Sequence, residues 1–208
     1  MTLVAPASRF IHARGYTNPE DYPTTYFNEC SMALMASKNT PNMIFTVKKY
    51  EEIMTDKQIM YAFHWIAQNK LEKTQDFWNY LIPLVKTQMK GLDKHTCPSF
   101  YKGVEAAALM QLQDNEFWEI VENKFVDEGL WLYLTLEDTV RFLCCLAKVG
   151  RGSDEIVDVI EKHLIKHRKG LTTDTINIAK QGFAKINKGS EILHRVLADP
   201  KTELPALE

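Results

Sequence analysis

Apolar residues recur at intervals of three and four positions from about residue 24 to residue 199. This spacing aligns them along one side of an α-helix, so the pattern predicts helices and no central β-sheet. A short apolar run that would suit a strand, residues 130–134, lies between helix signals. The chain is therefore expected to fold as an all-α protein with about ten helices in antiparallel pairs.

Polar residues that cap helix N-termini divide this pattern into elements. A first helix is expected from Thr24 or Thr25, and a second from Pro41 to about residue 54. Later helices are expected to begin at or just after Thr55, Thr74, Thr96, Asp114, Thr135, Ser153, Thr173 and Ser190. Pro83 falls inside one of these helices and is expected to kink it, because proline lacks a backbone N–H donor.

The same periodicity predicts which side chains form the core. In the first two helices the inward positions are expected to be Phe27, Met32, Leu34, Met35, Ile44, Phe45, Val47 and Ile53. A later stripe ends at Leu109, and another includes Cys144 and Ala147. The side chains expected to be most deeply buried are Phe63, Phe77, Val104, Phe117, Leu143, Ile160 and Phe183.

Two similar stretches of sequence lie 37 residues apart. Residues 145–153 read Cys-Leu-Ala-Lys-Val-Gly-Arg-Gly-Ser, and residues 182–190 read Gly-Phe-Ala-Lys-Ile-Asn-Lys-Gly-Ser. Both copies end an apolar helix on a basic, glycine-containing turn and begin the next helix at a serine. A repeat of this length is typical of proteins that stack helix pairs.

Three glycine–leucine pairs, at Gly91, Gly129 and Gly170, keep a similar period. Each glycine is expected to end a helix in the left-handed conformation, with the following leucine packing back on the last turn. The repeats predict a right-handed α-solenoid with a period of about 37–42 residues, in which each helix pair covers the apolar face of its neighbour. The expected organisation is an N-terminal arm at residues 1–23, a helical-repeat domain at 24–199 and a tail at 200–208.

The two copies of the repeated stretch resemble the core motif of organellar helical repeats, the octotricopeptide-like repeats and those of the FAST-kinase-like mitochondrial proteins. The resemblance covers residues 135–195 well and residues 55–134 loosely. It implies an α-helical repeat fold and a mitochondrial or plastid location. Members of these families are often RNA-binding proteins, and diverged relatives resemble accessory subunits of large mitochondrial complexes.

The charge distribution favours protein partners over nucleic acid. The formal net charge is −2, whereas a nucleic-acid-binding protein usually carries a clear positive excess. Residues 103–140 contain nine acidic residues against Lys124, and residues 141–195 contain eleven basic residues against six acidic ones. A chain with opposite charge in adjacent segments suits protein neighbours of both signs.

Several residues could carry chemistry, and for each a structural role is the better prediction. His163 and His167 lie four positions apart but lack the glutamate that follows the first histidine in a zinc motif. The turn from Gly150 to Ser153 could hold a phosphate, yet it lacks the length and lysine of a P-loop. No catalytic residue, metal site or cofactor is therefore predicted.

The cysteines and aromatic residues lead to the same prediction. The four cysteines are expected to be reduced thiols, and the adjacent pair Cys144 and Cys145 should pack in a core. Phe77, Trp78, Phe117 and Trp118 could stack on RNA bases, but their recurrence at one repeat position indicates core contacts.

The N-terminal segment gives the location and the candidate binding residues. Residues 1–19 contain no Asp or Glu but contain Arg9 and Arg14, which is typical of mitochondrial targeting segments. A random polar tail is the alternative. The predicted partner-binding residues of this arm are Phe10, Ile11, Arg14 and Tyr16. No apolar run approaches the ~20 residues that span a bilayer.

Two functions follow from these observations. The first is a non-catalytic accessory subunit of a large mitochondrial assembly, most plausibly an inner-membrane respiratory-chain or ATP synthase complex. The second is an organellar RNA-binding repeat protein, in a mitochondrial ribosome or an RNA-processing factor. A conventional enzyme ranks third.

Overall fold

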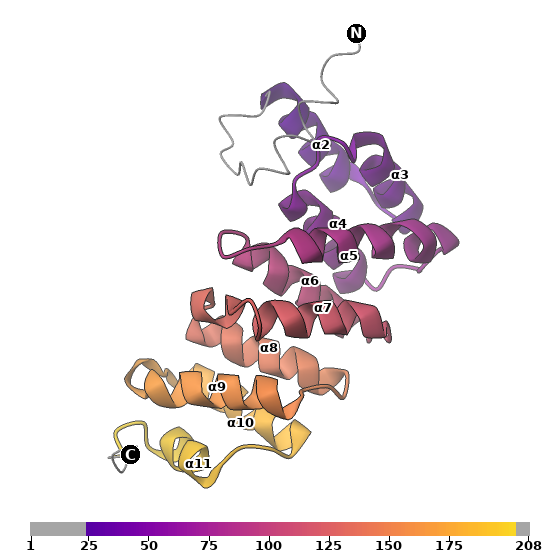
Figure 1. Cartoon of the computed structure of the whole chain (residues 1–208). Helices are drawn as coiled ribbons and strands as arrows, with labels where there is room; N and C mark the ends of the chain where they lie inside the picture. The colour runs from indigo at the N-terminus through magenta and orange to yellow at the C-terminus, as the bar shows by residue number, and fades with distance from the viewer. Residues whose placement is uncertain (1–23, 203–208) are drawn as a thin grey trace. The chain divides into compact units, whose positions relative to one another are not determined.

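The computed structural model describes residues 24–202. Within this range the chain forms ten α-helices and no β-strand (Figure 1), so the predicted all-α fold is confirmed. The chain divides into two compact units, residues 1–92 and 93–208.

The described part of the first unit contains two helix pairs. The pairs are α2 (Thr24–Ala36) with α3 (Thr40–Tyr50), and α4 (Asp56–Gln68) with a helix that begins at residue 75. The latter includes one π-helical turn, η2 (Phe77–Leu81), and continues as α5 (Ile82–Gly91). Helix α3 packs against α2, α4 and η2, and α4 packs against α5.

A π-helical turn lies just before Pro83, at the place where the sequence predicts a kink. The amide of Ile82 donates to the carbonyl of Phe77, five residues earlier, instead of to the residue four positions back. Proline cannot donate to the preceding turn and its ring crowds the carbonyl there, so a locally widened helix accommodates it. Phe77 and Leu81 within this turn are fully buried.

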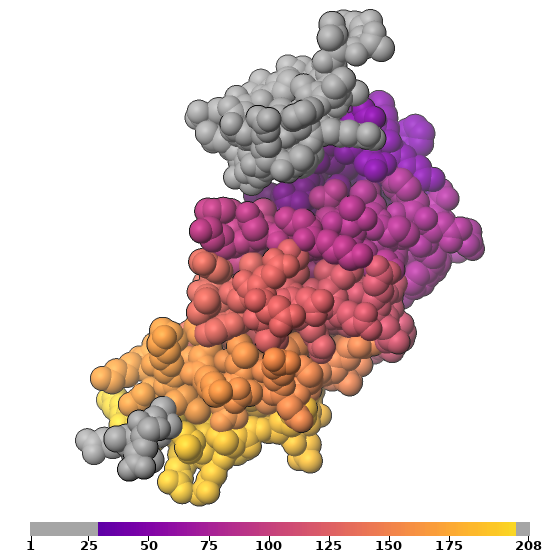
Figure 2. Space-filling model, viewed as in Figure 1, coloured from indigo at the N-terminus to yellow at the C-terminus, as the bar shows by residue number. Residues whose placement is uncertain are grey.

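The second unit contains three helix pairs. They are α6 (Cys97–Leu109) with α7 (Asn115–Phe125), α8 (Leu136–Lys148) with α9 (Asp154–Lys166), and α10 (Thr173–Ile186) with α11 (Glu191–Ala198). Short 3₁₀ turns, η3 (Leu130–Tyr133) and η4 (Arg168–Gly170), lie between the pairs. Helix α8 packs against both α6 and α10, and α9 packs against α11 (Figure 1). Residues of this unit form successive layers in chain order (Figure 2).

The turn between the two helices of a pair has the same geometry four times. In each, a left-handed residue follows the first helix: Lys70, Gln111, Gly150 and Asn187. The amide of the next residue then donates to a carbonyl five positions back, from Leu71 to Ile66, Leu112 to Ala107, Arg151 to Leu146 and Lys188 to Phe183. This is the hydrogen bond that closes a helix in a Schellman motif. This turn geometry therefore recurs in four helix pairs, two more than the repeated sequence shows.

The predicted left-handed glycines need a correction. Gly129 has φ +67°, as expected, but Gly91 and Gly170 do not have positive φ. Gly91 is the last residue of α5 and Gly170 the last of η4, so both mark helix ends without the special conformation. Three non-glycine residues adopt it instead, because each is fixed by the helix-closing hydrogen bond beside it.

Most N-terminal caps are confirmed. The side chains of Thr55, Asp114, Thr135, Ser153 and Ser190 each accept a hydrogen bond from a backbone amide in the first helical turn. Thr74 precedes its helix as predicted, but its hydroxyl is buried and has no hydrogen-bond partner. The helices expected at Pro41 and Thr173 are capped by Asn39 and Thr172.

All seven side chains expected to be most buried are fully buried. The helical phase was wrong at the edges of the predicted core: Met32, Met35, Phe45 and Leu109 are exposed. In α8, Cys144 and Ala147 are only half-buried, whereas Phe142 is fully buried and stacks on Phe125 with ring centroids 4.1 Å apart. These helices carry apolar residues on more than one side, and the neighbouring helices decide which side is covered.

Candidate interaction surfaces

The predicted partner-binding residues Phe10, Ile11, Arg14 and Tyr16 lie outside the described residues. The prediction for the N-terminal arm therefore stays a prediction.

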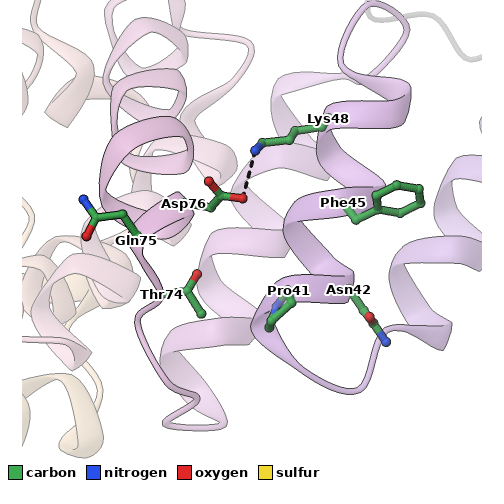
Figure 3. A pocket seen from close by; sticks show the side chains of 7 residues that line it. All are labelled: Pro41, Asn42, Phe45, Lys48, Thr74, Gln75 and Asp76. Atoms are coloured by element: carbon green, nitrogen blue, oxygen red, sulfur yellow. Dashed lines mark hydrogen bonds and ion pairs between the residues drawn. The ribbon is translucent and has the colours of Figure 1, made fainter.

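A shallow depression of about 530 Å³ lies in the first unit, where the N-terminal turn of α3 approaches residues 74–76 (Figure 3). Pro41, Phe45 and Thr74 line it, and Lys48 pairs with Asp76 across it at 2.9 Å. The ion pair neutralises the two charged side chains that a ligand would meet. Both partners are largely exposed, so their attraction is weak.

The turn from Gly150 to Ser153 uses its polar groups to hold the fold together. The hydroxyl of Ser153 caps α9, and the guanidinium of Arg151 donates to the side chain of Asn115. The carbonyl of Gly152 accepts from Lys188, whose ammonium also pairs with Asp154 at 2.6 Å. Arg151 of the first repeated stretch thus contacts the first turn of α7, and Lys188 of the second stretch contacts the first turn of α9. In both cases the contacted helix is the second helix of the preceding pair. The turn is a structural contact, as predicted.

The four cysteines are free thiols, as predicted. Burial raises the pKa of Cys30 to about 11 and that of Cys145 to about 12. Burial also raises the pKa of the Cys144 thiol, partly offset by the positive charges of Lys185 and Lys148. A thiol is a nucleophile only as the thiolate, so burial lowers the nucleophilicity of these three thiols.

The paired aromatic residues divide between core and surface. Phe77, Phe117 and Trp118 are fully buried, and the indole of Trp118 donates to the carbonyl of Leu112 at 2.8 Å. Trp78 is exposed by 44%, and the ammonium of Lys73 lies 5.9 Å from its ring centre. Three of the four rings therefore cannot stack on a base.

His163 and His167 belong to a cluster of rings in the second unit. The ring of His163 lies 5.3 Å from Trp131 and 4.7 Å from His167, centre to centre. His163 is buried, and its Nδ1 has no hydrogen-bond partner. Burial, and then the neighbouring His167 and Lys166, lower the pKa of His163. Within residues 24–202, no group of three potential metal ligands comes together.

This ring cluster connects two exposed features of the second unit. On one side is η3, where Leu132 and Tyr133 are exposed by 57% and 53%. On the other is a depression of about 440 Å³, which Leu136 and the run from Lys166 to Gly170 line. We call this combined surface the η3–α9 patch. The sequence signal was available, as an apolar run after Gly129 and a basic run after Leu164, but the two lie about 35 residues apart.

The η3–α9 patch contains basic side chains that no ion pair neutralises within the described residues. Neither Lys166 nor Lys169 pairs with a carboxylate in the part of the chain that the structure describes. Arg168 donates to the carbonyl of Ile165 at the end of α9. Cations at this position are stabilised by the partial negative charge of the helix C-terminus, which explains why they gather here.

No family model and no curated protein sequence matches this chain. None of the described helices is long and apolar enough to cross a membrane.

Proposed function

We propose that this protein is a non-catalytic, helical-repeat scaffold that binds protein subunits of a large mitochondrial assembly. Its helix pairs stack as a right-handed α-solenoid. The observation that carries the proposal is the same helix-closing turn after Lys70, Gln111, Gly150 and Asn187, at intervals of 41, 39 and 37 residues. Stacked helix pairs present extended surfaces, which is how repeat proteins recognise their partners.

The proposed location rests on the sequence alone. The acid-poor N-terminal segment with Arg9 and Arg14, together with the resemblance to organellar repeats, supports a mitochondrial protein. An inner-membrane respiratory-chain or ATP synthase complex fits a net charge of −2 better than a ribosome does, because ribosomal subunits must meet RNA phosphates.

Deletion of residues 2–18 tests the proposal. We expect the shortened chain, imported into mitochondria behind a cleavable foreign targeting segment, to keep its helical circular dichroism. It should be lost from the high-molecular-mass fraction on a native gel, because Phe10, Ile11 and Tyr16 would anchor the arm on neighbouring subunits. The full-length chain behind the same foreign segment is the control.

Two results would contradict the proposal. One is a full-length chain that migrates as a free monomer in mitochondrial extracts. The other is a deletion variant that assembles as well as the full-length chain, which would leave the arm without a role in assembly.

A further inference from the structure

The η3–α9 patch has the chemistry of a protein-docking site with two halves. Leu132 and Tyr133 are exposed in η3, and Lys166 and Lys169 are exposed at the end of α9 and in η4, where neither forms an ion pair with a carboxylate of residues 24–202. Tyrosine is enriched at protein interfaces and is among the residues that contribute most to their binding energy. The ring contacts of Trp131 with His163 and of His163 with His167 join η3 to the end of α9.

We infer that the η3–α9 patch binds a protein segment in which carboxylates adjoin apolar side chains. The carboxylates pair with Lys166 and Lys169 at the depression, and the apolar side chains cover Leu132 and Tyr133. This inference deepens the proposed scaffold function and rests on it, since it assigns one surface through which the scaffold holds a partner.

Acidic residues next to the patch argue for a protein segment over a polyanion. Asp127 and Glu128 precede η3 in the chain, and Glu137 and Asp138 follow it. Glu128 pairs with Lys124 and Glu137 with Arg141, so of these four carboxylates the ones without an ion pair within residues 24–202 are those of Asp127 and Asp138. RNA or an anionic lipid surface presents negative charge over a wide area, and repulsion between like charges acts over ~8–10 Å in salt, so unpaired carboxylates near the patch oppose it. A protein segment places its charges one residue at a time, so it can match the basic half without opposing the acidic border.

A peptide selection tests the inference with the isolated full-length chain. A displayed random-peptide library is selected on the wild-type protein, and the enriched peptides are synthesised and measured by fluorescence anisotropy. We expect enrichment of Asp and Glu next to Leu, Phe or Trp. Binding should weaken at least tenfold in the double variant Lys166→Glu, Lys169→Glu, and also in Tyr133→Ser, which tests the apolar half alone.

The matched control is the double variant Lys148→Glu, Lys180→Glu, which makes the same change of charge at exposed positions outside the patch. It should bind the enriched peptides as the wild type does. All altered side chains are exposed, so circular dichroism should show the same helix content for every variant.

The inference is overturned if no acidic–apolar motif is enriched, or if the enriched peptides bind the patch variant and the control equally. It is also overturned if a uridine oligonucleotide, or cardiolipin-containing vesicles, bind the wild type and lose binding in the Lys166→Glu, Lys169→Glu variant while the peptides do not. The assay uses the isolated chain, so its failure leaves the assembly result unaffected, and the reverse also holds.

Discussion

Gly182 lies where α10 meets α8, and its replacement by alanine should destabilise the second unit. A Cβ atom at this position would lie 2.9 Å from Cδ2 and 3.0 Å from Cγ of Leu143, and 3.3 Å from Sγ of Cys144. Carbon atoms in favourable contact are about 3.5–4.0 Å apart, so the alanine methyl group has no room. Leu143 is fully buried and cannot turn away into solvent.

Two opposing effects set the magnitude. Alanine favours a helix interior over glycine by about 0.8–1.0 kcal/mol, which would stabilise α10. Forcing a methyl group into a packed core costs about 1–3 kcal/mol, and contact with two atoms of one immobile leucine places this site in the upper half of that range. The expected net loss in the free energy of unfolding is about 1–2 kcal/mol.

Urea unfolding followed by circular dichroism measures this loss, provided that the slope against urea concentration is unchanged. Gly91→Ala is the matched control. Gly91 is also helical with an ordinary φ, and nothing lies within 4 Å of a Cβ added there. The Gly91→Ala substitution should therefore raise the free energy of unfolding by about 0.4–1 kcal/mol.

The second half of the test removes the Leu143 side chain, which blocks the added methyl group. In a Leu143→Ala background, Gly182→Ala should become neutral or stabilising, because the added methyl group then fills space that the leucine has left. The reasoning is refuted if Gly182→Ala alone is as stable as the wild type, or if its cost is the same with and without Leu143.

Three further predictions concern the second unit. Phe183→Ala should lower the free energy of unfolding by about 3–5 kcal/mol in urea denaturation, because the ring is fully buried; a loss below 1 kcal/mol would mean that α10 is loosely packed. Asn187 has φ +52°, so Asn187→Ala should cost about 1–2 kcal/mol while Asn187→Gly costs little, and equal stability of the two would contradict the left-handed turn. The lowered pKa of His163 means that the unfolded chain takes up a proton at this residue at higher pH than the folded chain does. Stability should therefore fall as pH decreases below about 6.5, more in the wild type than in His163→Gln, and parallel pH profiles would contradict this.

Local features of the sequence determined where the helices begin and end. The caps at Thr55, Asp114, Thr135, Ser153 and Ser190 involve hydrogen bonds that span only three residues, so nearby sequence suffices to predict them. The deepest core positions were also predictable, since a side chain at the centre of an apolar stripe is buried whichever neighbour covers it.

Tertiary structure decided which of the apolar residues are buried and which residues adopt the left-handed conformation. Met32, Met35 and Phe45 are as apolar as their buried neighbours, yet their side of the helix faces away from the elements that pack against it. Lys70, Gln111 and Asn187 adopt the left-handed conformation without being glycine, because the hydrogen bond from the next residue requires it. The sequence pattern identifies which residues favour this conformation, whereas the chain path determines which residues must adopt it.

The η3–α9 patch is likewise determined partly by the sequence and partly by the tertiary structure. Each half is visible in the sequence as an apolar or a basic run, but a helical period cannot tell which runs from different repeats will meet. Their meeting depends on the contact of Trp131 with His163 and of His163 with His167, which exists only once η3 and α9 have folded against each other. Segments far apart in sequence become one surface only through packing, and packing is a property of the folded chain.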